Sequence, residues 1–275
     1  MPEGPEIRIL RDRLAEALEG ETAIRLEFHL PALQRWKGRF DGCRILRLES
    51  RGKALLTHLS SGYSLFSHNQ LYGRWYLLPA GESADTKRRL RLAIHTRGHS
   101  ALLYSASQIE VWPRKELHLH PFLSKLGPDV LDPDTRFDQI RARLLEKPWF
   151  RRQLGSLLTN QSFVAGVGNY LRCEILFVAA IHPSQRPCDL DDQHLERLAR
   201  AILELPRRSY ATKGITNELE RAQSLMEAGA TFEGARFHLY RREGKPCYRC
   251  GTAIRFMRRG GQGTYLCPGC QPTPA

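Results

Sequence analysis

Short apolar runs and amphipathic stretches divide the chain into two parts. Between residues 22 and 111, short apolar runs alternate with turns that are rich in Gly, Ser and charged residues. This pattern is typical of an antiparallel β-sandwich or barrel. The expected strands cover residues 23–28, 44–48, 54–59, 63–67, 75–78, 90–95 and 101–104.

Helical periodicity marks the other ordered segments. Residues 5–18 carry apolar side chains at three- and four-residue spacing, which predicts an amphipathic helix that Gly20 ends. The predicted fold class is therefore α+β, with an N-terminal helix and β-sandwich followed by a helical domain. The helices expected after residue 135 cover residues 138–145, 154–161, 169–179 and 191–205.

Repeated prolines between residues 113 and 135 interrupt any continuous element and indicate a linker. We place the domain boundary near this proline-rich segment. The predicted organisation is a catalytic β-sandwich domain over residues 1–127, a linker over 128–135, a helical domain over 136–235 and a C-terminal hairpin module over 236–271.

Four of the seven cysteines form the most specific motif. Cys247-x-x-Cys250 and Cys267-x-x-Cys270, separated by sixteen residues, have the spacing of a zinc ribbon. Four thiolates close a tetrahedral site and leave no position for a reactive water, so we expect one structural zinc ion. Such a cluster also favours a reducing compartment over disulfide bonds. We interpret the other three cysteines as packing residues or thiols without a metal.

The net charge of +13 and the pI of about 9.7 favour a polyanionic partner, either nucleic acid or an anionic membrane surface. Membrane attachment has little support, because no apolar run approaches 18 residues and the N-terminus lacks a signal sequence. We therefore expect a cytoplasmic protein. Residues 236–271 contain eight basic residues against the single acid Glu243, which predicts a phosphate-binding module.

The N-terminal sequence Met1-Pro2-Glu3-Gly4-Pro5-Glu6 has two interpretations. Removal of Met1 would make the Pro2 nitrogen a secondary amine, and an α-amino group titrates near pH ~8. Such an amine attacks electrophilic carbon, with Glu3 beside it to transfer a proton. Alternatively, these residues only start a helix, with proline in its first turn and two glutamates favoured by the helix dipole.

Three further segments carry candidate chemistry, each with a plainer alternative. Arg51-Gly52-Lys53 is either a solvated hairpin tip or a turn that aims Lys53 at DNA. Gln70-Leu71-Tyr72 is either a buried hairpin end or a wedge that fills the gap left by a flipped base. Val164–Tyr170 is either an ordinary helical hairpin or a phosphate-binding turn, in which Asn169 caps the next helix.

These motifs, in this order along the whole chain, resemble the formamidopyrimidine-DNA glycosylase and endonuclease VIII family of DNA-repair enzymes. The contiguous Gln70-Leu71-Tyr72 is similar to the endonuclease VIII branch. The resemblance implies a Schiff base between Pro2 and the sugar, with Glu3 as the acid, Glu6 as a supporting residue and Lys53 in proton handling. It further implies a helix–two-turns–helix element with Glu174 as its structural partner, and a lid or disorder over 213–235. The implied DNA contacts are Gln70, Leu71, Tyr72, Lys125 and Asn169.

One position departs from the family pattern. The family has a phosphate-binding arginine in the zinc hairpin, where this sequence has Gln262. Arg258 and Arg259 are the neighbours that would take over the phosphate, and without them the second cleavage step would be weaker.

The predicted function is excision of oxidised pyrimidines from double-stranded DNA, followed by β-elimination and then δ-elimination at the abasic site. We expect a monomer that binds DNA in a basic cleft between its domains. Two alternatives remain: an oxidised-purine glycosylase of the same family, or a zinc-dependent protein that binds damaged DNA without cutting it.

Overall fold

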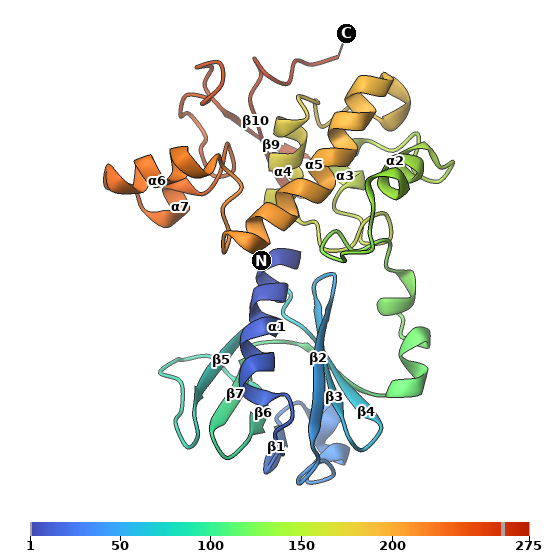
Figure 1. The fold of residues 1–275 in the computed structure, drawn as a ribbon, viewed down its shortest axis with the longest axis vertical. Coiled ribbons are helices and arrows are strands. Elements are labelled where there is room, and N and C mark those ends of the chain that lie inside the picture. Colours follow the sequence, from blue (N-terminus) through green and yellow to red (C-terminus); the bar gives the residue numbers. More distant parts are fainter. Residues whose placement is uncertain (1, 260–261, 275) are drawn as a thin grey trace. The chain divides into compact units, whose positions relative to one another are not determined.

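A computed structural model describes residues 2–259 and 262–274, without the side chains of Arg259 and Gln262. The chain forms two compact units (Figure 1). The first contains Met1–Pro2 and Glu6–Lys125. The second contains Leu126–Ala275 together with Glu3–Pro5, so the residues directly after Pro2 belong to the helical unit.

The first unit is a sandwich of two four-stranded antiparallel sheets, with strand orders β1-β6-β7-β5 and β2-β3-β4-β8. Apolar side chains of both sheets meet in one core with Leu14 and Leu18 of helix α1, which confirms the predicted sandwich. The element bounds are α1 Gly4–Leu18, β1 Arg25–Phe28, β2 Ile45–Arg51, β3 Ala54–Leu59, β4 Tyr63–His68, β5 Arg74–Pro79, β6 Leu90–His95, β7 His99–Tyr104 and β8 Gln108–Pro113.

Strand β8 was missing from the expected set. Its sequence ends in Pro113, and we interpreted this proline as the beginning of the linker. Because β8 lies at the edge of its sheet beside β4, its outer side needs no ladder hydrogen bonds and tolerates a proline. Short 3-10 helices that apolar periodicity does not reveal cover Pro31–Trp36, Arg114–Leu119 and Leu123–Lys125.

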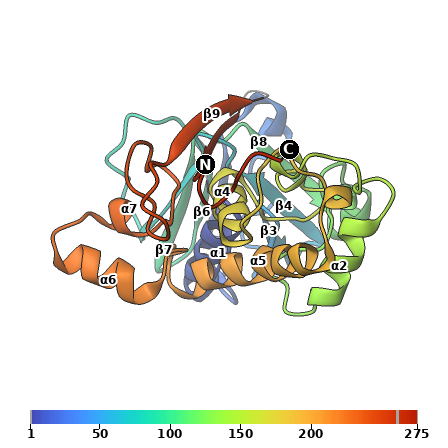
Figure 2. The same ribbon diagram turned by 90° about the horizontal axis from the view of Figure 1, so that it is seen from above.

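The second unit is helical, and its core lies between α2, α4 and α5. Figure 1 shows the long helix α5 beside α4, and Figures 1 and 2 both show α6 and α7 projecting to one side of them. The bounds are α2 Phe137–Leu145, α3 Leu154–Leu157, α4 Asn169–Val178, η4 Pro187–Asp189, α5 Asp192–Ala211, α6 Leu219–Glu227 and α7 Phe232–Ala235.

Three expectations for this unit need correction. The helix expected over 154–161 is shorter, because the Gln161 side chain bonds the backbone of Gly166 and Val167 and turns the chain. Helix α5 continues past its expected end through the buried Pro206. The segment 213–235 contains helices α6 and α7, so the expected disorder is wrong, whereas the lid stays a prediction.

The chain closes with an antiparallel hairpin of β9 Arg255–Arg259 and β10 Gln262–Leu266, which packs against α4. This hairpin confirms the predicted C-terminal module. Within the described ranges, no helix is both long and apolar enough to cross a membrane.

Candidate active site and nucleic-acid interface

The carboxylate of Glu3 is buried against the turn that begins helix α4. Its Oε2 accepts hydrogen bonds from the backbone N–H of Gly168 at 2.7 Å and of Leu171 at 3.3 Å. Its Oε1 accepts a third from the N–H of Tyr170 at 2.8 Å. Glu3 is only 2% exposed, and three N–H donors stabilise its ionised form. The chain next to Pro2 is therefore held in one position.

This contact corrects the predicted cap of helix α4. Asn169 is the first residue of the helix instead of its cap, and Gly168 precedes the helix. Glu3 supplies the capping carboxylate from the other end of the sequence, so the N–H groups that we expected to bind phosphate already pair with protein. A side chain at position 168 would overlap the Glu3 carboxyl group, which explains the glycine.

Arg172 joins Asn169 to the zinc hairpin. Its Nη2 donates to Asn169 Oδ1 at 2.5 Å, and also to Gly263 O at 3.0 Å and Thr264 Oγ1 at 2.8 Å. Arg172 is 3% exposed. Because Oδ1 of Asn169 faces the guanidinium, its Nδ2 points away from Arg172 as a donor, which suits an anionic acceptor. We missed this role of Arg172, although a charged residue in a largely apolar helix was a usable signal.

Lys53 lies in the tight connection between β2 and β3. Arg51 pairs with Ala54 across this connection, and Gly52 takes a left-handed φ of 57°. Lys53 is 6% exposed, so the alternative of a solvated hairpin tip is wrong. Burial of the imidazole, reinforced by the Lys53 cation, lowers the pKa of His68 to about 4. His68 is therefore neutral near pH 7.

The connection between β4 and β5 presents apolar side chains to solvent. Leu71 is 65% exposed and Tyr72 is 69% exposed, so the alternative of a buried hairpin end is wrong. The turn is closed by a hydrogen bond from the Gly73 N–H to the Asn69 carbonyl at 2.7 Å. Gln70 adopts a φ of 49°, in the left-handed region.

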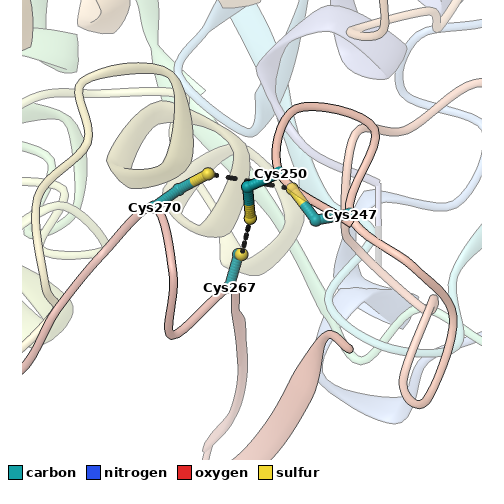
Figure 3. A group of neighbouring side chains, drawn as sticks. All are labelled: Cys247, Cys250, Cys267 and Cys270. Carbon is teal, nitrogen blue, oxygen red and sulfur yellow. Dashed lines mark hydrogen bonds between the residues drawn. The ribbon is translucent and has the colours of Figure 1, made fainter. Parts of the chain in front are cut away.

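The four cysteines of the C-terminal module converge on one point (Figure 3). All four sulfur atoms lie within 4.8 Å of one another. The Cys247–Cys270 sulfurs are 3.8 Å apart and the Cys250–Cys267 sulfurs are 3.3 Å apart. A tetrahedral Zn–S length near 2.3 Å gives sulfur separations of about 3.8 Å, so these residues fit one zinc ion. The complete set of four thiolates makes this a structural site.

The structure gives the exposure of three further predicted site residues. Glu6 is half-buried in the first turn of α1, Lys125 is exposed at the end of the first unit, and Arg258 is exposed on β9. The side chains of Arg259 and Gln262 lie outside the described structure. Their backbones face each other at the end of the hairpin.

Several arginines of the basic module have internal partners. Arg242 is 4% exposed, and its guanidinium lies 3.4 Å from the ring centroid of Tyr248. Arg249 donates to the Phe177 carbonyl at 3.2 Å, and Arg236 stacks on the ring of Phe237. Fewer basic side chains of this module are therefore available to bind phosphate than its eight basic residues imply. Its exposed members include Lys245, Arg255 and Arg258.

We expected the buried Glu174 to bond the turn before α4, but its hydrogen bonds go to other residues. Its Oε2 accepts from Thr216 Oγ1 and from the His238 N–H, both at 2.8 Å. Its Oε1 accepts from the N–H groups of Leu239 at 3.0 Å and Tyr240 at 2.9 Å. Glu174 instead fixes the segment that leads into the zinc module.

Sequence comparisons cover nearly the whole chain. The formamidopyrimidine-DNA glycosylase N-terminal domain matches residues 1–108, the H2TH domain of the same glycosylase matches residues 126–220, and a zinc finger found in FPG and IleRS matches residues 244–273. The chain is 43% identical to endonuclease 8 of Escherichia coli and 44% identical to that of Pectobacterium atrosepticum. Each match covers 98% of this chain and 100% of the relative.

Solved structures agree on the fold. A complex of Lactococcus lactis Fpg with DNA containing an oxidised pyrimidine has a TM-score of 0.81 at 22% identity, covering 99% of this chain and 100% of that chain. A complex of LlFpg with THF-DNA and an inhibitor has a TM-score of 0.83 at 23% identity, with the same coverage. The chain therefore belongs to the formamidopyrimidine-DNA glycosylase and endonuclease VIII family, whose members are DNA glycosylases and AP lyases.

Proposed function

We propose that this protein excises oxidised pyrimidines from double-stranded DNA and then cleaves the strand, with the Pro2 nitrogen as the nucleophile. The observation that carries the proposal is the burial of Glu3 against the start of α4. Chain termini are poorly ordered unless something fixes them. A terminus fixed by a buried carboxylate beside its amine is suited to chemistry. The identity to proteins named endonuclease 8 supports the choice of substrate.

In the proposed reaction, the Pro2 nitrogen forms a bond to C1′ of the damaged nucleotide while the bond from C1′ to the base breaks. Because hydrogen bonds keep Glu3 ionised, its proton comes from the Pro2 ammonium, and Glu3 passes it to the departing base. The nitrogen bonded to C1′ then gives up its remaining hydrogen, O4′ takes up a proton, and the C1′–O4′ bond breaks to leave an open sugar with an iminium. The iminium acidifies the C2′ proton, and loss of this proton expels the 3′ phosphate. Loss of the 5′ phosphate follows by δ-elimination.

The other residues bind and orient the DNA. Lys53 helps to place the damaged nucleotide and transfers protons during strand cleavage, and Glu6 supports the site. Leu71 and Tyr72, with Gln70, occupy the gap in the base stack. The remaining proposed phosphate contacts are Lys125, Asn169, Arg258, Arg259 and Gln262.

The zinc ion proposed for the four cysteines holds the hairpin and takes no part in the reaction. Arg172 links the hairpin to Asn169, because its guanidinium donates both to the Gly263 carbonyl and to the Asn169 side chain. The zinc module thereby helps to orient the Asn169 side chain, which we propose donates a hydrogen bond to a DNA phosphate.

Borohydride trapping tests the nucleophile. Protein that lacks Met1, verified by intact mass, is compared with a form that carries one glycine before Pro2, in which the proline nitrogen is an amide. We expect a covalent complex with an oxidised-pyrimidine duplex only for the first form. If the first form binds the duplex and gives no complex, the enzyme proposal fails and a damage-binding protein remains.

A matched duplex with an oxidised purine tests the substrate class. We expect slower single-turnover excision from this duplex than from the pyrimidine duplex. The opposite order would assign the protein to the purine-excising alternative while leaving the Pro2 mechanism intact.

A further inference from the structure

The wedge loop, residues 69–73, is anchored through Gln70. The Gln70 N–H donates to Nδ1 of His68 at 3.0 Å. Its side-chain Oε1 accepts from Ser107 Oγ at 2.5 Å, and its Nε2 donates to Gln108 Oε1 at 3.5 Å. The left-handed φ of 49° is uncommon for a residue with a side chain and persists where surrounding contacts enforce it. These bonds supply that enforcement.

His68 is itself held in place. It pairs across the β3–β4 ladder with Ala54, the residue that follows Lys53 in the sequence. Its ring packs edge-on against that of Phe122, with 5.4 Å between the ring centroids. To accept the Gln70 N–H, Nδ1 must carry no proton, which requires the neutral ring with its hydrogen on Nε2. Burial and the Lys53 cation favour that neutral form.

The other end of the loop has its own contact. Arg88 Nη1 donates to the carbonyl of Tyr72 at 2.6 Å. At the base, the Cβ of any larger residue at position 73 would lie 2.6 Å from the Asn69 carbonyl oxygen, so Gly73 permits the tight closure. Between these two attachments, the side chains of Leu71 and Tyr72 extend into solvent. The three residues of the triplet are therefore not equivalent, because Gln70 is bound to the sandwich and the other two are presented.

We propose that His68 and Ser107 are positioning residues that hold Gln70 and thereby present Leu71 and Tyr72 to the gap in the base stack. This inference rests on the proposed function and refines it, since Gln70 acts first as the attachment of the wedge. Preorganising the loop before DNA binds removes the cost of ordering it at the moment of base flipping.

Two substitution pairs test the proposal. His68→Leu removes the acceptor, whereas His68→Asn retains an acceptor on a short side chain. Ser107→Ala removes the hydroxyl, whereas Ser107→Thr retains it. Ser61→Ala, at an exposed serine in the β3–β4 turn, is the control. Each protein is measured for single-turnover excision from an oxidised-pyrimidine duplex and for wedge insertion by 2-aminopurine fluorescence opposite the lesion.

Borohydride trapping on a single-stranded oligonucleotide with an abasic site isolates the chemistry, because this substrate has no stack gap to fill. We expect His68→Leu and Ser107→Ala to lower duplex excision about fivefold or more, together with the fluorescence change. We expect single-strand trapping to stay at the wild-type level. His68→Asn, Ser107→Thr and Ser61→Ala should remain close to wild type in every assay.

Wild-type behaviour of both His68→Leu and Ser107→Ala would overturn the proposal. An equal loss of single-strand trapping would also overturn it, since the residues would then act on the chemistry or the fold instead of the wedge. Absence of trapping by the wild-type protein on either substrate is a different result, because it refutes the proposed function itself.

Discussion

Glu3 and Glu174 are two buried carboxylates of the second unit that are held in nearly the same way. Glu3 is 2% exposed and accepts three backbone N–H bonds, and Glu174 is 0% exposed and accepts three backbone N–H bonds and one hydroxyl. Both positions satisfy the requirement that a buried charge be fully hydrogen-bonded. Their surroundings differ. Glu3 adjoins the candidate nucleophile, whereas Glu174 joins helix α4 to the segment before the zinc module.

The comparison shows that hydrogen-bond satisfaction alone does not identify a catalytic carboxylate. What distinguishes the two is the group that each one fixes in space. Glu3 fixes the chain beside Pro2, whose nitrogen we propose as the nucleophile, whereas Glu174 fixes the backbone of residues 238–240. The function of a buried carboxylate therefore has to be inferred from the chemistry of the group that it holds in place.

The largest expected effect separates the two carboxylates by chemistry. Glu3→Gln keeps an oxygen that accepts N–H bonds but removes the charge that transfers the proton. We expect single-turnover base excision to fall by about 10²- to 10⁴-fold. Trapping of a preformed abasic site should persist, because the base has already departed and an α-amine that titrates near pH ~8 is partly neutral without Glu3.

Glu174→Gln is the matched control for that experiment. Measured per folded molecule, its excision rate should stay within about threefold of wild type, since Glu174 accepts hydrogen bonds from Thr216 and residues 238–240 and has no assigned part in the proposed chemistry. Equal losses of excision in both variants would show that the two carboxylates do not have separate roles.

The next expected effect concerns the contribution of Glu174 to the stability of the fold. Glu174→Ala leaves the Thr216 hydroxyl and three buried N–H groups without their acceptor, at about 1–3 kcal/mol for each unsatisfied group. We expect the free energy of unfolding in urea to decrease by more than about 3 kcal/mol, with weaker zinc retention. Thr216→Val removes one donor and should cost about 1 kcal/mol. A loss no larger than that of Thr216→Val would remove Glu174 from its assigned role.

Gly168→Ala displaces Glu3 without changing it. An added Cβ would overlap the Glu3 carboxyl group, so the carboxylate has to shift from its N–H donors. We expect base excision to fall by about 10- to 100-fold, as for a small misplacement of a catalytic group. Gly98→Ala is the control, because no atom lies within 4 Å of its added Cβ. Excision that is unchanged in Gly168→Ala would mean that the position of Glu3 is unimportant.

Much of this architecture was predictable from local sequence. Alternating apolar runs predicted the sandwich, and the cysteine spacing predicted the metal site, because both depend on short-range periodicity. The helix at residues 5–18 was likewise predictable, and the structure extends it by one residue, from Gly4. Strand β8 was not, since Pro113 is tolerated only because β8 is an edge strand, and edge position is a tertiary property.

The candidate site was less predictable because its contacts span the whole sequence. Glu3 and Gly168 are separated by 165 positions, so no local pattern assigns the cap of α4 to Glu3. Asn169 was the better local candidate, and it is instead bonded by Arg172. The same limit applies to Glu174, whose donors lie more than forty positions away.

Glu49 extends the comparison to a carboxylate that side chains hold near the surface, and it gives the smallest expected effect. A hydrogen bond from His58, with Arg51 and Arg47 nearby, lowers the pKa of Glu49 to about 2 from its ordinary 4.5. Its contribution to stability is therefore complete above pH 4.5 and disappears as the pH falls toward 2. Solvent screening keeps this contribution small. Melting temperatures of wild type and Glu49→Gln should converge across that interval, whereas the exposed control Glu82→Gln should follow wild type throughout. A constant difference between wild type and Glu49→Gln would show that packing, and not ionisation, accounts for the effect of this residue.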